Sequence, residues 1–412
     1  MINKDHAFKT IDGYREEIIN FQTELTAIPA LSPDNGGSGE HEKSEYIKGK
    51  LEELQPTKLQ EIKSPDERAK DGYRPNIVAT WEKDSTKPFA WVLSHMDIVP
   101  PGDLSLWDSD PYEVKVDGDN IIGRGVEDNQ HGIVASYLAL KAVIESDCQV
   151  NNVGLVMVAD EENGSKYGLD YVLKNHRELF SKDDLIIVPD WGAEDGSLIE
   201  VAEKSMLWVK FSVKGLQCHA STPERGNNSL YGTAKLILEL ETLKKKFDLS
   251  DNLFSPPLST FEPTKIEANV PNVNTIPGKD TFYMDCRILP AYETDEVLES
   301  IKELTHKIED ELSLTIDMGI VNREDASNPT SVDAPVVKAL KKAIKEVKGI
   351  DAATMGIGGG TVASFFRRAG FPAAVWGTCL DVAHQPNEYC RIKDLIEDIK
   401  ILASIYMDEN LE

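Results

Sequence analysis

The sequence predicts an α/β protein in which a mostly parallel sheet is flanked by helices and a smaller α+β domain is inserted. Apolar runs alternate with amphipathic helical segments over residues 76–188, an order typical of βαβ units. The pattern changes over residues 206–325, where strands and a few helices follow one another in a β-α-β-β-α-β order. The α/β alternation then resumes near the C-terminus. We therefore expect one domain built from both ends of the chain, with a second domain inserted in it.

The first part of the chain contains two kinds of segment. Apolar residues at helical spacing predict helices over residues 13–28 and 41–54, which a Pro/Gly-rich loop separates. Short continuous apolar runs bounded by turn residues predict buried strands, with helices between them. The expected strands are 76–81, 89–94, 153–159 and 185–188, and the later expected helices are 133–144 and 167–173.

The inserted segment is expected to fold as a ferredoxin-like domain, and the last segment completes the first domain. The resulting domain boundaries are 1–205, 206–325 and 326–412. In the insert we expect strands at 207–213, 281–289 and 314–321, helices at 230–247 and 294–312, and a Pro-rich link at 255–263. In the last segment we expect helices at 334–347 and 393–408, a helix ending at 369, a strand at 373–376 and a glycine run at 356–360.

Composition limits the possible partners and compartments. The chain has 412 residues, enough for two domains with their own cores. Its net charge of −27 argues against nucleic acid or an anionic membrane surface as a partner. The five cysteines are scattered without a CxxC pair, which fits a reducing compartment. Because there is neither the apolar core of a signal peptide nor a run of ~20 apolar residues, we expect a cytoplasmic protein.

Three of the expected strands run directly into polar side chains. His95 and Asp97 follow the strand at 89–94, three acids (160–162) follow the strand at 153–159, and Asp190 follows the strand at 185–188. Ligands of open α/β sheets bind at the carboxyl ends of the strands, so these groups are expected to converge. Adjacent carboxylates are costly to bury without a cation, although a solvated turn is the alternative interpretation.

Three further features of the sequence each have two interpretations. His95 and Asp97 point to one face of an extended chain, where a carboxylate orients a metal-bound imidazole; otherwise they are a polar strand end. Asp128 follows two glycines and precedes a helix, so it is either an N-cap or a carboxylate that bridges two cations. His384 lies in a polar loop and is either solvated or the second imidazole of a dinuclear site.

Nine motifs extend the pattern over nearly the whole chain. They are SHMDIVP (94–100), GRGVED (123–128), ADEENGS (159–165), PDWG (189–192), KGLQCHAST (214–222), NTIPG (274–278), DCRILP (285–290), GGGT (358–361) and AHQPNE (383–388). Together these motifs resemble the co-catalytic zinc metallopeptidase and amidohydrolase family, which includes acetylornithine deacetylase, succinyl-diaminopimelate desuccinylase, aminoacylase, carboxypeptidase G and several dipeptidases. The resemblance implies a zinc exopeptidase-like fold with a dimerisation or lid domain.

The resemblance also implies two metal ions and a general base. Nitrogen and carboxylate ligands without thiolate suit Zn²⁺, with Co²⁺ or Mn²⁺ as possible substitutes. Asp97 is expected to orient a ligand, and Glu161 to move the protons of the reaction. The implied ligands are His95 and Asp190 for one ion, Glu162 and His384 for the other, and Asp128 as the bridge.

The resemblance assigns further residues to substrate. His219 is expected to reach the active site of a partner subunit and bind the tetrahedral intermediate, which implies a homodimer. Arg287 matches an arginine that clamps a substrate carboxylate, a task suited to its fork geometry, and Asn274 matches an asparagine near the same place. The glycine run is expected to offer backbone groups to the substrate. Its residues are Gly359, Gly360 and Thr361.

The expected function is hydrolysis of an amide bond next to a free carboxylate, most simply in an N-acyl amino acid of the acetyl or succinyl type. A dipeptidase or carboxypeptidase is the alternative, and a non-catalytic binding protein on this fold would be signalled by missing ligands, of which there are none. Two departures from the family pattern leave the substrate open: Asn129-Gln130-His131 stands where many members have Met-Lys-Gly, and Val362 where Asp is common. His131 is expected either near the metals or packed on its helix.

Overall fold

The computed structural model describes residues 4–409, which form two compact units. Unit 1 contains the described residues up to Val201, together with Thr330–Met355 and the described residues from Thr361 on. Unit 2 contains Ala202–Pro329 and the glycine run Gly356–Gly360. The segment expected as an insertion, 206–325, therefore lies within unit 2, which extends slightly further in both directions.

Unit 1 is built around an eight-stranded sheet with the order β1-β2-β6-β3-β7-β16-β8-β15. Its four central strands, β6, β3, β7 and β16, pair in parallel, whereas β1, β2 and β8 pair antiparallel. The predicted mostly parallel sheet is confirmed, with antiparallel strands added toward its edges. The bounds are β1 Lys58–Pro65, β2 Tyr73–Trp81, β3 Phe89–His95, β6 Asn152–Val158, β7 Leu185–Val188, β8 Leu198–Glu203, β15 Ala353–Ile357 and β16 Ala373–Val375.

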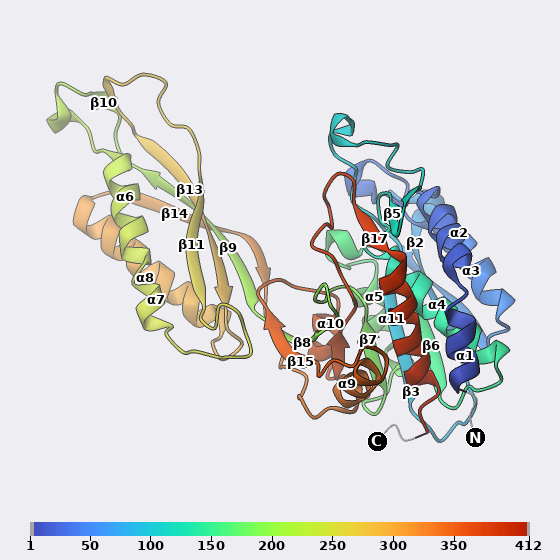
Figure 1. The fold of residues 1–412 in the computed structure, drawn as a ribbon. Helices are drawn as coiled ribbons and strands as arrows, with labels where there is room; N and C mark the ends of the chain where they lie inside the picture. Colours follow the sequence, from blue (N-terminus) through green and yellow to red (C-terminus); the bar gives the residue numbers. More distant parts are fainter. Residues whose placement is uncertain (1–3, 410–412) are drawn as a thin grey trace. The chain divides into compact units, whose positions relative to one another are not determined.

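Helices cover both faces of this sheet because successive residues of its buried strands point to opposite sides. Trp91 and Leu93 of β3 pack with α5 and α10 in one apolar cluster. The other face is covered by α4, which is buried over almost its whole length and contacts α11 (Figure 1). The helices are α1 Lys4–Ile11, α2 Arg15–Thr26, α3 His41–Glu53, α4 Gln130–Glu145, α5 Leu169–Asn175, α9 Pro335–Lys348, α10 Ala363–Arg368 and α11 Ile392–Tyr406.

A small three-stranded sheet joins two distant loops of unit 1. Its order is β17-β5-β4, with β17 (Tyr389–Arg391) paired antiparallel to β5 (Asn120–Ile122), which in turn pairs with β4 (Lys115–Asp117). The pairing brings the segment that precedes Asp128 beside the segment that follows His384. These strands are only three residues long, too short for periodicity to predict.

Unit 2 is a four-stranded antiparallel sheet of order β11-β13-β9-β14, with three helices packed on one face (Figure 1). Its core includes the stacked rings of Phe211 and Phe282, whose centroids lie 4.7 Å apart. A separate two-stranded ribbon pairs β10 with β12. The bounds are β9 Ser205–Lys214, β10 Cys218–His219, α6 Ser229–Leu240, α7 Leu243–Lys246, β11 Thr260–Ile266, β12 Thr275–Ile276, β13 Lys279–Ile288, α8 Thr294–Leu312 and β14 Thr315–Glu324.

Three sequence expectations need correction. The helix expected at 13–28 is present as α2, but the sequence did not predict the separate helix α1 before it, which has only two buried apolar residues. The helix expected at 230–247 is divided into α6 and α7. The link expected at 255–263 runs into β11, an edge strand that accommodates Pro263 at a register irregularity against β13. β11 supplies the strand needed for the β-α-β-β-α-β order.

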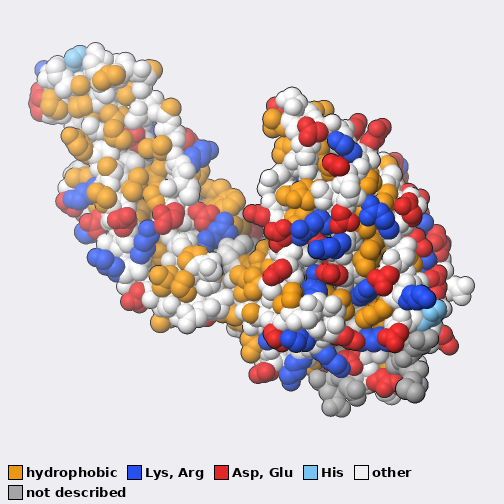
Figure 2. All heavy atoms as spheres, in the orientation of Figure 1, with side chains coloured by type: hydrophobic (Ala, Val, Ile, Leu, Met, Phe, Trp, Pro, Cys, Tyr) orange, Lys and Arg blue, Asp and Glu red, His pale blue; other side chains and the backbone are white. Residues whose placement is uncertain are grey.

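The described surface mixes charges of both signs, with acidic and basic side chains interspersed over the visible face (Figure 2). All five cysteines are free thiols. Among residues 4–409, every helix falls short of the length and apolar character that a bilayer-spanning helix requires.

Candidate metal centre

The polar residues expected to converge do so at one edge of the unit 1 sheet. β3, β6 and β7 are parallel, and His95 at the end of β3 is in register with Val158 at the end of β6. The acidic turn that follows β6 and the loop that follows β7 therefore emerge at the same edge. The turn is not solvated: the side chain of Asp160 is 2% exposed and that of Glu162 is 6% exposed.

A first group of ligand atoms surrounds His95. Its Nε2 lies 2.9 Å from Oδ1 of Asp128 and 3.4 Å from Oδ1 of Asp190. The carboxylate of Glu161 belongs to the same neighbourhood, because ligand atoms of His95, Glu161 and Asp190 all lie within 4.8 Å of one another. Two carboxylates and an imidazole thus face one point, with Glu161 beside them.

A second group surrounds His384. Its Nε2 lies 3.0 Å from Oδ2 of Asp128 and 3.1 Å from Oε2 of Glu162. The two oxygens of Asp128 therefore face two different imidazoles, as a bridging carboxylate requires. Asp128 is not a helix cap, since α4 begins at Gln130 after Asn129 and receives no side-chain cap from either. His384 is half exposed, yet its ring nitrogen is directed into the group rather than toward solvent.

The spacing of these atoms fits divalent cations. Nitrogen and oxygen ligands about 2.1 Å from a tetrahedral Zn²⁺ lie about 3.4 Å from one another, close to the separations of 2.9–3.4 Å found here. Moreover, Oε1 of Glu162 is buried and has no hydrogen-bond partner among the described residues. Burying a carboxylate oxygen without a hydrogen-bond donor is energetically costly, and a bound cation would offset this cost.

The electrostatics of the centre also favour bound cations. Burial raises the pKa of Glu162 to about 7, and burial together with the charge of Asp190 raises the pKa of Glu161 well above its usual value. The carboxylates of Asp128 and Glu162 raise the pKa of His384 to about 10. Without cations, these groups can only relieve their mutual repulsion by holding protons. Divalent cations would replace those protons.

Asp97 organises this centre in two ways. Nδ1 of His95 lies 3.0 Å from the main-chain oxygen of Asp97, which orients the ring so that Nε2 faces the carboxylates. The carboxylate of Asp97 accepts hydrogen bonds from the backbone N–H groups of Glu161 (3.0 Å) and Glu162 (3.1 Å). The sequence suggested that the carboxylate of Asp97 orients His95, but its Oδ1 lies 3.6 Å from Nδ1 and the main-chain oxygen makes the closer contact. The carboxylate instead attaches the acidic turn to the end of β3.

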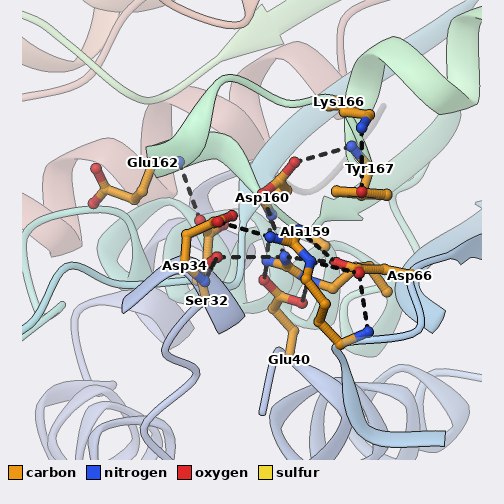
Figure 3. A network of polar contacts seen from close by, with 12 residues as sticks. Ser32, Asp34, Glu40, Asp66, Ala159, Asp160, Glu162, Lys166 and Tyr167 are labelled. Atoms are coloured by element: carbon orange, nitrogen blue, oxygen red, sulfur yellow. Dashed lines mark hydrogen bonds and ion pairs between the residues drawn. The ribbon is translucent and has the colours of Figure 1, made fainter. Parts of the chain in front are cut away.

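Asp160 belongs to a buried network behind the turn (Figure 3). It adopts a positive φ of 62°, accepts from Arg74 at 3.3 Å, and accepts from the backbone N–H of Tyr167 at 2.9 Å. Arg74 is fully buried and also pairs with Glu40. Removing one partner of a buried ion pair typically costs about 3–5 kcal/mol, so this network holds the turn firmly. Figure 3 shows the carboxylate of Glu162 pointing away from that of Asp160.

Glu388 is an important residue to which the sequence assigned no role. It is fully buried and accepts hydrogen bonds from the backbone N–H groups of Glu127 (2.9 Å) and Asp128 (3.0 Å). It also pairs with Arg124 at 2.6 Å, and Arg124 donates to the main-chain oxygen of His384 at 3.3 Å. One buried ion pair therefore holds the two loops that carry Asp128 and His384.

The residues that depart from the family pattern have structural roles. Asn129 accepts from the backbone N–H of His95 at 3.3 Å and donates to the main-chain oxygen of Pro189, so it connects the ends of β3 and β7. His131 is buried on α4, with Nε2 3.7 Å from the thiol of Cys379, and packs there rather than among the ligands. Val362 is buried in the apolar cluster under α10.

The substrate residues expected from the sequence are divided between the units. His219 and Asn274 lie together on the β10–β12 ribbon, where the backbone N–H of Ala220 donates to the main-chain oxygen of Asn274 at 2.9 Å. Arg287 lies at the other end of β13, about 27 Å along the strand. There it pairs with Asp285 and donates to the main-chain oxygen of Gly358. Within one chain, Asn274 therefore lies far from Arg287. Gly359 and Gly360 belong to unit 2 and Thr361 to unit 1.

The fold and the centre together define a metal-dependent peptidase or amidohydrolase. Residues 91–408 match the peptidase family M20/M25/M40. The chain belongs to this family, as the motif resemblance predicted.

Similar proteins agree with this assignment. The chain is 43% identical over 406 residues to an uncharacterized metallohydrolase of Methanocaldococcus jannaschii, covering 95% of this chain and 98% of that protein. It is 25% identical over 374 residues to the succinyl-diaminopimelate desuccinylase of Nitratiruptor sp., covering 90% and 94%. The di-peptidase Dug1p from Saccharomyces cerevisiae has the same fold, with a TM-score of 0.75 at 16% identity and 98% coverage of both chains.

Proposed function

We propose that this protein is a dinuclear metal-dependent hydrolase that removes the acyl group from an N-acyl amino acid by cleaving an amide bond next to a free carboxylate. The observation that carries the proposal is the arrangement around Asp128, whose two oxygens face the imidazoles of His95 and His384. Each imidazole has a further carboxylate beside it, from Asp190 and Glu162 respectively. The proposed ions are Zn²⁺, with Co²⁺ or Mn²⁺ able to substitute.

The side chains of this chain would perform the proton transfers. When bound, the two ions polarise the scissile carbonyl and make the attacking water more acidic. The Glu161 carboxylate takes the proton of that water and returns it to the nitrogen of the leaving amine. Burial suits Glu161 to this task because its raised pKa lets it hold a proton between the two steps. The side chain of His219 donates a hydrogen bond to the oxyanion of the tetrahedral intermediate.

Arg287 is the proposed recognition group for the free carboxylate of the substrate. Its guanidinium is partly exposed and is held by Asp285 and by the main-chain oxygen of Gly358. A guanidinium held in this way keeps a fixed donor geometry. The backbone of Gly359, Gly360 and Thr361 would line the same substrate. A relative named as a desuccinylase supports an N-acyl substrate. A dipeptidase or carboxypeptidase is the alternative, since the solved structures include peptidases of this fold.

We also propose a homodimer formed through unit 2, whose residues 206–325 would act as the dimerisation and lid domain while 1–205 and 326–412 form the catalytic domain. β14 is an edge strand of its sheet, with Ile320 and Val321 about half exposed, and edges of this kind pair readily. Tyr231 (75% exposed) and Leu238 (66%) add apolar surface on α6, and hydrophobic side chains are exposed over this unit in Figure 2.

The free cysteines support a cytoplasmic location.

A direct assay tests the function. The purified full-length chain is loaded with Zn²⁺, its metal content is measured, and release of free amine is followed with N-acetyl amino acids, N-succinyl amino acids and dipeptides. We expect hydrolysis of at least one N-acyl class and a much lower rate for the matching amide in which the free carboxylate is blocked. Faster hydrolysis of dipeptides would favour the alternative. A chain with two bound ions that cleaves none of these substrates would contradict the proposal.

Subunit mixing tests whether His219 acts in the partner's site. Glu161→Gln and His219→Ala chains are each expected to be nearly inactive. When they are mixed and allowed to exchange, half of the dimers are mixed, and each mixed dimer has one complete site. We therefore expect recovery to about one quarter of the native rate. Self-mixing of each variant is the control. If the mixture stays as inactive as its components although exchange is demonstrated, His219 does not act across the dimer.

A further inference from the structure

The ring of His219 is held by the residue two positions further along the chain. The backbone N–H of Ser221 points at Nδ1 of His219 across 3.1 Å, and the hydroxyl of Ser221 lies 2.8 Å from the same nitrogen. A backbone N–H can only donate, so Nδ1 must act as an acceptor. In the neutral ring, the proton then resides on Nε2.

The rest of the loop fixes the backbone of His219 without touching its ring. Its main chain pairs with Thr275 in the β10–β12 ribbon, and the backbone N–H of Thr222 donates to its main-chain oxygen at 3.0 Å. The hydroxyl of Thr222 reaches the same main-chain oxygen at 3.3 Å. Among the described residues, the contacts of the ring are made at Nδ1, so Nε2 remains available as a donor.

We infer that Ser221 is a positioning residue that sets the tautomer of His219, so that Nε2 presents a hydrogen-bond donor to an anionic oxygen of the reacting substrate. This inference rests on the proposed function, in which His219 stabilises the oxyanion. The opposite tautomer would present a lone pair to that oxygen and repel it. Asn274 on the same ribbon is arranged alike: its Oδ1 accepts from Asn272 at 2.5 Å, which leaves the NH₂ group of Asn274 to donate.

Tautomer measurement tests the inference without any substrate. Full-length protein labelled with ¹⁵N-histidine is studied by long-range ¹H–¹⁵N spectroscopy, in buffer alkaline enough to keep exposed imidazole rings neutral. The His219 signal is assigned by its loss in His219→Gln. We expect the native ring to carry its proton on Nε2. Because Ser221→Ala removes the hydroxyl but keeps the backbone N–H, it should shift the tautomer ratio by about three- to tenfold toward Nδ1–H.

Two matched variants make the comparison specific. Ser221→Thr keeps a hydroxyl at this position and should restore the native ratio. Thr222→Ala removes the neighbouring hydroxyl, which touches only the main chain of His219, and should leave the ratio unchanged. In the amide hydrolysis assay, Ser221→Ala should lower kcat in proportion to the measured fall in the fraction of His219 rings that carry the proton on Nε2, with KM within about twofold of native.

Each outcome decides a separate part of the inference. A native ring protonated on Nδ1, or a ratio that is the same in Ser221→Ala and Thr222→Ala, would overturn the assignment of the tautomer to Ser221. A measured fall in the Nε2–H fraction without the proportional fall in kcat would overturn the importance of Ser221 for the reaction. If the protein hydrolyses no amide at all, the proposed function fails, whereas the spectra still decide whether Ser221 orients the ring.

Discussion

Replacing Glu161 with glutamine is expected to lower kcat by about 10²–10⁴-fold while the bound metal is retained. The amide keeps the size of the side chain but can no longer take a proton from the attacking water. The carboxylate of Glu161 lies within 4.8 Å of ligand atoms of His95 and Asp190, close enough to act on a water held there. Metal content after dialysis and the steady-state rate on the best N-acyl substrate are the two measurements.

The same geometry would also allow Glu161 to be a metal ligand, and the Glu161→Gln variant distinguishes a ligand from a general base. A general base predicts loss of turnover with full metal content, whereas a ligand predicts that metal is lost as well. Glu178→Gln is the matched control, because its side chain is 74% exposed on a surface turn of the same unit. Native turnover in Glu161→Gln would exclude its role as the base.

Replacing Asp128 with asparagine is expected to reduce the metal content to one ion per chain or less and to lower kcat by about 10³-fold or more. Oδ1 and Oδ2 of Asp128 face different imidazoles, at 2.9 and 3.0 Å, so both ligand groups depend on its two oxygens. An amide offers one oxygen and one NH₂ group, and the NH₂ group cannot bind a cation. One of the two groups must therefore lose a ligand.

Metal analysis after dialysis against metal-free buffer measures this effect, and the rate of amide hydrolysis measures its consequence. Asp117→Asn, an exposed carboxylate on the short strand β4, is the control and should behave as the native chain. Circular dichroism should be unchanged in both variants, which shows that the fold is intact. Two tightly bound ions in Asp128→Asn would show that Asp128 does not bridge them.

Parts of the centre were predictable because parallel strands impose them. His95, the acidic turn and Asp190 each follow a buried apolar run, and the parallel pairing of β3, β6 and β7 brings such run ends to one edge. Local patterning is sufficient for this because a buried strand is apolar throughout and its end is marked by the first charged residue. The same reasoning predicted the division of the fold into an α/β sheet and an α+β insert.

The positions of the loop residues could not be predicted in this way. A helix cap was the simplest interpretation of Asp128, and a loop histidine such as His384 is more often solvated than bound to a metal, because the local sequence of a loop does not determine its neighbours. Their placement depends on the short β17–β5 pairing and on the buried ion pair between Arg124 and Glu388. Both connect segments more than a hundred residues apart in the sequence.

The three acidic residues 160–162 show the same difference between what the sequence predicts and what the tertiary structure decides. From the sequence alone, Asp160, Glu161 and Glu162 were one cluster that was costly to bury without a cation, and the family motif assigned them different tasks. The tertiary structure separates them: Asp160 turns toward Arg74, while Glu162 faces His384. The direction of each carboxylate follows from the positive φ of Asp160 and from the two backbone N–H groups that Asp97 holds.

The sequence by itself determined the family, the class of fold and the strand ends at which polar groups gather, because these depend on local periodicity and on motif order. Only the tertiary structure decided which oxygen of Asp128 faces which imidazole, and that Asn274 lies far from Arg287 within one copy. The physical reason is that directed contacts of a few ångströms depend on loop conformations. Long-range hydrogen bonds and buried ion pairs determine these conformations, and neither appears in a local pattern of residues.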